Sequence, residues 1–265
     1  MFDQKIEEMI EQVQKPARYT GGEMNTAIKS WPEAEVHFAF CFPDTYEVAM
    51  SHLGMKILYG VINQQPWALC ERVCMPWVDM KALMEKEGVP LFSLETRTPL
   101  NRFDVVGFTL QYEMSYSNIL AMLKLGGIPL HTAERTDADP IVCVGGPCAF
   151  NPEPLADFVD AVMIGDGEEM IVEFIAAVRE WKKSGEPREA CLRRLAKIPG
   201  VYVPSFYEVS YHEDGTIAAF TPKCPEAPAT VRKRLVLDMD KAYYPTEIPV
   251  PYTEIVHDRI MLEIM

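Results

Sequence analysis

The feature that most constrains this chain is a repeated alternation of short apolar runs with segments of helical periodicity. The five apolar runs are strand-sized and lie at 36–42, 68–74, 104–110, 140–146 and 159–165. Between them, apolar residues recur at the spacing of amphipathic helices. Strands that are apolar along their whole length and alternate with helices form parallel sheets covered on both faces. The sequence therefore predicts an α/β fold with a doubly wound, five-stranded parallel sheet over residues 34–199.

The N-terminal region follows a different pattern. Residues 2–13 carry apolar side chains at helical spacing, and Pro16 follows them. Because a proline disfavours helix in the residue before it, this pattern predicts an amphipathic helix that ends before Pro16. We expect residues 1–33 to form a helical arm that rests on the main domain.

Beyond residue 200 the periodicity becomes that of strands. The chain alternates around Glu213-Asp214-Gly215, which predicts a β-hairpin, and residues 230–238 predict another strand. Prolines then indicate an extended connection. The last residues, 257–265, alternate like a half-buried strand without a polar tail. We expect residues 200–265 to be a β-rich extension and linker, cut at the entrance to a further domain.

The charge balance limits the partners of the chain. It has 39 acidic and 25 basic residues among 265, a formal net charge of -14, so direct binding of nucleic acid by this region is not expected. The sequence shows neither a signal peptide nor a membrane-spanning run, which predicts a cytoplasmic protein without a membrane role. The odd number of cysteines, 7, indicates reduced thiols. The pair Cys70 and Cys74 fits buried thiols better than metal ligands.

Ligands of doubly wound sheets bind beyond the carboxyl ends of the strands, so the loops there hold the candidate site residues. Asp44 ends the first strand and either caps the next helix or bonds a ligand. Ser115 and Ser117 follow the third strand with the same two options. Gly145 and Gly146 let the backbone turn or approach a flat ligand closely, because they carry no side chain.

The loop Gly165-Asp166-Gly167-Glu168-Glu169 opens the longest predicted helix. A helix N-terminus attracts anions, but these carboxylates would repel a phosphate. They either complement the helix dipole or bond hydroxyl, amide or ammonium groups of a ligand. No P-loop, nucleophile elbow or paired zinc motif is present. The basic residues 232–234 are interpreted as a solvated strand face.

The order of these motifs resembles that of radical S-adenosylmethionine proteins whose N-terminal region is a cobalamin-binding-like, flavodoxin-like domain. The similar segments, in order, are 15–25, 42–59, 106–120, 145–169 and 257–265. The resemblance implies that Gly145, Gly146, the serines and residues 165–169 occupy the loops that surround the corrin or its nucleotide tail. It also implies that the C-x-x-x-C-x-x-C motif for a four-iron four-sulfur cluster would begin after Met265.

Two departures from the family pattern matter. The chain holds no such cysteine triplet, so this region alone should bind no cluster and perform no radical chemistry. Cobalamin domains with a histidine ligand to cobalt carry D-x-H-x-x-G, whereas Ala49 and Ser51 stand before Gly54 here, with His52 one place late. The resemblance therefore implies either cobalamin bound without a protein histidine ligand or no cofactor.

The leading hypothesis is a cofactor-binding-like or substrate-presenting N-terminal domain of a radical S-adenosylmethionine enzyme, itself without catalytic or metal-binding residues. Its expected partner is a catalytic barrel in the same chain, which would hold the iron-sulfur cluster and S-adenosylmethionine. Its ligand-facing edge would comprise Asp44, Gly54, Ser115, Ser117, Gly145, Gly146 and Gly165, Asp166, Gly167, Glu168, Glu169. The alternative is a stand-alone flavodoxin-like module that recognises a protein partner or nucleotide without catalysis.

Overall fold

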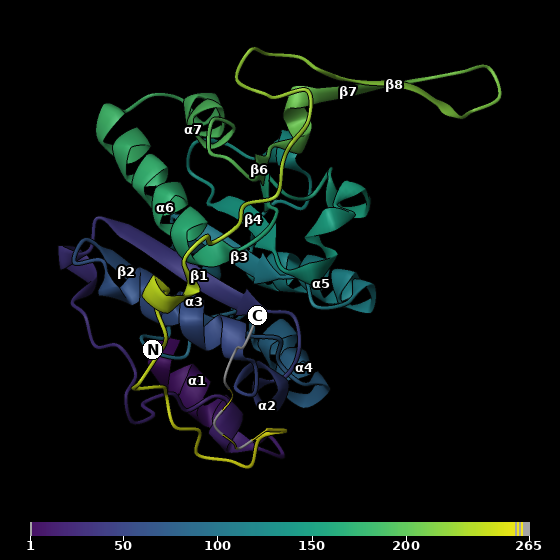
Figure 1. Cartoon of the computed structure of the whole chain (residues 1–265). Coiled ribbons are helices and arrows are strands. Elements are labelled where there is room, and N and C mark those ends of the chain that lie inside the picture. Colours follow the sequence, from purple (N-terminus) through teal and green to yellow (C-terminus); the bar gives the residue numbers. More distant parts are fainter. Residues whose placement is uncertain (1, 258, 260, 262–265) are drawn as a thin grey trace.

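A six-stranded, mostly parallel sheet forms the centre of the molecule (Figure 1). The computed structural model describes residues 2–257, 259 and 261. The sheet has the order β2-β1-β3-β4-β5-β6. Its strands are β1 (Val36–Phe42), β2 (Ala68–Cys74), β3 (Val105–Thr109), β4 (Ile141–Gly145), β5 (Ala161–Met163) and β6 (Val201–Tyr202). The α/β prediction is confirmed, and every expected apolar run contributes a strand.

The predicted number of strands is wrong by one. β1 to β5 are mutually parallel, as expected, but β6 pairs antiparallel with β5 at the edge of the sheet. In β6, Val201 lies opposite Met163, and Tyr202 lies opposite Val162. With only two residues, β6 is too short to produce a recognisable periodicity in the sequence.

The strand order places a topological switch point between β1 and β3. The chain leaves β1 toward β2 on one side and returns to β3 on the other. Because parallel crossovers are right-handed, helices of the two directions cover opposite faces of the sheet. The helices are α1 (Phe2–Ile10), α2 (Tyr46–Ala49), α3 (Leu53–Gln64), α4 (Val78–Glu87), α5 (Tyr116–Leu125), α6 (Gly167–Ser184) and α7 (Arg188–Leu195).

The helices pack as a doubly wound topology requires. α3 and α6 contact each other, and they contact β2 and β1 respectively. α4 and α5 line a shallow pocket together through Met84 and Leu125. The crossover from β4 to β5 contains no α-helix; short 3-10 turns at Pro147–Phe150 and Glu153–Leu155 span it instead. This leaves the carboxyl end of β4 uncovered by a helix.

The N-terminal arm is fixed to the sheet by one fully buried ion pair. The predicted helix is present as α1, whose Ile6 and Met9 are buried, and it contacts α4. Further along the arm, Glu23 bonds to Arg72 of β2 with Oε2 2.8 Å from Nη2. Arg72 also donates from Nε to Glu95 at 2.7 Å, and its side chain is 1% exposed. The segment around Cys70 is therefore an edge strand held under the arm.

The C-terminal region differs partly from expectation. The hairpin is present as β7 (Tyr207–Tyr211) and β8 (Ile217–Pro222), and Figure 1 shows it extending away from the body. The strand predicted at 230–238 is wrong: this segment is extended but makes only an isolated bridge between Arg234 and Gly165. The strand predicted at 257–265 lies largely outside the described residues.

No helix in the described part of the chain is both long and apolar enough to cross a membrane.

Candidate functional site

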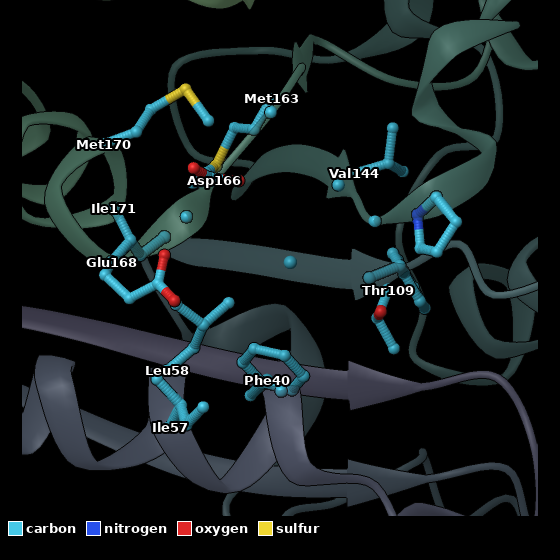
Figure 2. Close-up of a pocket in the computed structure, with 18 of the residues that line it drawn as sticks. Phe40, Ile57, Leu58, Thr109, Val144, Met163, Asp166, Glu168, Met170 and Ile171 are labelled. Carbon is cyan, nitrogen blue, oxygen red and sulfur yellow. The ribbon is translucent and has the colours of Figure 1, made fainter. Parts of the chain in front are cut away.

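A cavity of about 850 Å³ lies between the sheet and the helices α3 and α6. It runs over β1, β3 and β4 and reaches the loops at their carboxyl ends. Figure 2 shows side chains from these elements gathered around it. Its apolar lining includes Phe40, Ile57, Leu58, Val144, Met163, Met170 and Ile171. A concave, mostly apolar space of this size at a switch point is the usual form of a small-molecule site.

Two glycines in the lining allow neighbouring parts of the protein to pack closely against β3 and the end of β4. Gly107 in β3 lies against the Phe38 ring, and a Cβ there would come within 2.4 Å of its Cζ atom. Gly146 has φ +107°, a conformation that side chains rarely adopt, and a Cβ would lie 2.9 Å from the Leu110 carbonyl oxygen. Gly146 is therefore required for the turn that ends β4.

A chain of polar side chains forms one wall. His52 is the N-cap of α3, and its Nδ1 accepts the Met55 N–H at 3.1 Å. Burial lowers the pKa of His52, so the ring is neutral near pH 7 with its proton on Nε2. Gln111 donates from Nε2 to the Thr109 hydroxyl oxygen at 2.5 Å. The Thr109 hydrogen is then available to a ligand acceptor in the cavity.

The segment around His52, expected to be helical, is not one continuous helix. α2 ends at Ala49 and α3 begins at Leu53, so the residues between them do not follow one helical direction. His52 consequently lines the cavity although it stands one place late in the sequence pattern. Ser51, which stands at the histidine position of the D-x-H-x-x-G pattern, is buried and donates to the Glu47 carbonyl at 2.7 Å. The described residues define no metal site beside it.

The cavity brings together seven of the predicted site residues. They are Gly54, Gly145, Gly146, Gly165, Asp166, Gly167 and Glu168. Their role in ligand binding stays a prediction.

The other four predicted residues do not line the cavity. Asp44 accepts the Tyr112 hydroxyl at 2.9 Å and the Thr45 N–H at 2.7 Å. Ser115 and Ser117 donate back to the carbonyls of Tyr112 and Met114, so neither serine caps α5. The fourth residue, Glu169, accepts a hydrogen bond from Arg234 of the C-terminal region at 2.9 Å. These side chains mainly order the loops beside the cavity.

Residues 232–234 do not form the predicted strand face, although Arg232 and Lys233 are exposed as expected. Residues 231–236, here called the strap, cross the loop that opens α6. The Arg234 N–H donates to the Ile164 carbonyl at 2.9 Å, and the Arg234 carbonyl accepts the Asp166 N–H at 3.0 Å. The Val236 N–H donates to Asp166 Oδ2 at 2.7 Å. One carboxylate of the loop therefore binds the strap backbone.

Sequence reasoning missed several residues of the lining. Thr109 and Gln111 lie at the end of a correctly predicted strand, and this position was a usable signal. His52 lies between α2 and α3, where one continuous helix was expected. Lys233 and Leu235 of the strap also line the cavity. Nothing local indicates this, since their place depends on a contact with Gly165 far away in the sequence.

Exposed apolar side chains, here called the rim, lie in the loops that follow β3 and β4. Tyr112, Met114 and Phe150 are exposed by 42%, 84% and 61%, respectively. Phe150 also lines the cavity, so the exposed patch and the cavity are continuous. A ligand could thus occupy the cavity with one part and cover this rim with another.

The described residues contain no cluster of three or more histidine, cysteine or acidic side chains suited to hold a metal ion. The seven cysteines are free. Burial raises the pKa of the Cys70 thiol well above its ordinary value, which fits the predicted buried thiol.

Comparison with protein families identifies the relationship. A family model described as "Radical SAM proteins, N-terminal" matches residues 54–204. The chain belongs to this family. The matched part of this radical SAM N-terminal region contains α3, β3, β4 and the start of α6, which form most of the cavity wall. The strap lies beyond it.

Individual relatives are more distant. The uncharacterized protein MJ0966 of Methanocaldococcus jannaschii is 30% identical over 99 residues, which is 37% of this chain and 21% of that protein. The chain thus aligns with about a fifth of the length of this curated relative.

Two solved structures show weaker similarity. One is the radical S-adenosylmethionine methyltransferase TsrM from Kitasatospora setae, with tryptophan substrate and a SAM analog bound (15% identity, TM-score 0.39, covering 68% of this chain and 29% of TsrM). The other is the cobalamin-dependent S-adenosylmethionine radical enzyme OxsB, with aqua-cobalamin and S-adenosylmethionine bound (12% identity, TM-score 0.39, covering 83% and 24%).

Proposed function

We propose that this radical SAM N-terminal region holds a corrinoid for a radical S-adenosylmethionine enzyme. The observation that carries the proposal is the cavity of about 850 Å³ between α3, α6 and the sheet, which opens at the carboxyl ends of the strands. A cavity of this kind argues for a ligand, rather than for a fold that has lost its cofactor.

The shape of the site fits a corrinoid in two parts. Cobalamin consists of a broad, flat ring and a slender aromatic nucleotide tail. The benzimidazole base of the tail is the part that the apolar cavity can accommodate, and Thr109 would donate a hydrogen bond to it. The phosphate of the tail would stay outside, away from Asp166 and Glu168. The ring would lie on the exposed rim formed by Tyr112, Met114 and Phe150. A bound corrinoid would supply a cobalt centre able to carry a methyl group.

The residues of the site would bind and orient the cofactor without a histidine ligand to cobalt. His52 Nδ1 is engaged by the Met55 N–H, and its ring belongs to the polar wall of the cavity. Gly145 and Gly146 would allow close approach of the ligand to the end of β4. Asp44, through its bond to Tyr112, would keep one side of the rim in place.

The proposal extends to the whole enzyme. A catalytic barrel in the same chain would bind the four-iron four-sulfur cluster and S-adenosylmethionine and generate the radical. The rim of the cavity would then face the barrel. Reading the gene beyond the codon for Met265 tests this part directly: a cysteine triplet supports it, and a stop codon favours a stand-alone binding module.

Cobalamin binding can be tested with two ligands that differ only in the tail. Purified protein is incubated with hydroxocobalamin or with diaquacobinamide, which has the ring but no nucleotide, and the visible spectrum is recorded after desalting. We expect retained corrin absorbance with hydroxocobalamin and at least about tenfold weaker binding of cobinamide, because the buried aromatic tail is lost. No retention of either ligand would refute the corrinoid assignment. Equal retention would refute a tail in the cavity.

A further inference from the structure

We propose that the strap, residues 231–236, is a gate to the cavity and that Arg234 is its latch. This inference rests on the proposed function only in taking the cavity to be a ligand site, and it concerns how that site is opened and closed. Its physical basis is that the strap supplies one wall of the cavity and is held there by three main-chain hydrogen bonds and by two partly exposed ion pairs of one side chain.

The strap is extended, so alternate side chains point to opposite sides. Lys233 and Leu235 line the cavity. Arg234, between them, points to α6 and donates from Nη2 to Glu169 Oε2 at 2.9 Å and to Glu173 Oε1 at 2.8 Å. The latch and the wall are thus successive residues, and release of Arg234 would move both wall residues together.

The strap lies directly on the loop before α6. Gly165 has φ +110°, and a Cβ there would be 2.1 Å from the Arg234 carbonyl oxygen. Gly200 supports the other side, where a Cβ would be 3.1 Å from the Arg234 Cβ. Two glycines therefore make space for one strap residue, which defines the closed position sharply.

Three main-chain hydrogen bonds to Ile164 and Asp166 hold this position, and the two ion pairs of Arg234 add to them. The Glu169 and Glu173 side chains are 55% and 42% exposed, and ion pairs of this kind stabilise weakly and are screened by salt. Immediately after the strap, Leu237 is 92% exposed. A segment with few buried contacts opens locally far more often than the core unfolds. The strap has the properties expected of a gate rather than of a core strand.

The test compares Arg234→Ala with Arg232→Ala, an exposed arginine of the same strap. Stopped-flow mixing with hydroxocobalamin measures association, and 8-anilinonaphthalene-1-sulfonate serves as a second, non-corrinoid probe of access to the apolar cavity. We expect association with both probes to be about three- to tenfold faster in Arg234→Ala, the effect of losing two exposed ion pairs, and unchanged in Arg232→Ala. Added salt should accelerate association in the wild type and not in Arg234→Ala.

Amide hydrogen exchange gives a readout that needs no ligand. The Val236 N–H, which bonds to Asp166, should exchange faster in Arg234→Ala than in Arg232→Ala, while amides of β3 and β4 keep their protection in both. Equal exchange at Val236 together with equal dye association in the two variants would overturn the gate. Accelerated dye association without any retained corrinoid would support the gate and refute the corrinoid assignment.

Discussion

At the carboxyl end of β4, two adjacent glycines differ in what a side chain would meet. Gly145 has ordinary backbone geometry, and a Cβ would lie 3.5 Å from the Met163 carbonyl oxygen, an ordinary contact. Gly146 needs a positive φ and has no such space. We expect Gly145→Val to fold and to weaken hydroxocobalamin binding about tenfold or more by filling the cavity. Gly146→Val should instead lose about 1–3 kcal/mol of stability.

Thermal unfolding and corrinoid titration of both variants separate these effects. If Gly145→Val bound hydroxocobalamin as tightly as the wild type, the cavity would not be the binding site. If Gly146→Val had the same thermal stability as the wild type, the turn after β4 would not require a glycine at this position.

A second prediction at the residue scale concerns acid stability. Since burial lowers the pKa of His52 in the folded state, the unfolded chain takes up its proton first as the pH falls. The stability from neutral His52 is therefore complete above its unfolded pKa, near 6.5, and is lost below it. Asn at position 52 keeps an acceptor for the Met55 N–H but does not titrate.

We expect His52→Asn to have nearly wild-type stability at pH 7.5 and a shallower loss between about pH 6.5 and 5. Urea unfolding across this range measures the slope. The same slope in both proteins would show that His52 is as easily protonated in the folded as in the unfolded state.

At the scale of elements, the attachment of the N-terminal arm to the sheet depends on the buried guanidinium of Arg72. Burial alone would raise the pKa of Glu23, yet the Arg72 charge holds it below its ordinary value. Removing Glu23 leaves the buried guanidinium paired with Glu95 alone and takes the carboxylate acceptor from its Nη2. We expect Glu23→Ala to cost about 3–5 kcal/mol in urea unfolding and Glu33→Ala, in an exposed part of the arm, less than about 0.5 kcal/mol. Similar values for both would mean that the ion pair does not anchor the arm.

The elements themselves show what local patterns can predict. β1 and β2 coincide with their apolar runs, and α4 is followed directly by Gly88, whose φ of +63° suits a glycine at the end of a helix. These features depend on neighbours in the sequence. The strap carries apolar and basic residues in alternation and was predicted as a strand. Its actual position is set by the missing side chain of Gly165, about seventy positions away.

At the scale of the whole molecule, the sequence predicted where a site would be but not its walls. The order of strands and helices implied a ligand edge at their carboxyl ends, and seven predicted residues do meet there. The cavity also needs the facing sides of α3 and α6, which contact each other over the same face of the sheet. No spacing within one segment encodes that contact, so Leu58 and Ile171 could not be assigned to the site beforehand.

The strap is also synthesised later than the loop that it covers. Val236, which bonds to Asp166, follows it by 70 positions, so it leaves the ribosome later. At about 5–20 residues per second, the loop before α6 is synthesised several seconds before the strap. During translation the cavity therefore lacks one wall for an interval that is long compared with diffusion of a small molecule. A cofactor present in the cell could enter the nascent domain before the strap arrives to cover it.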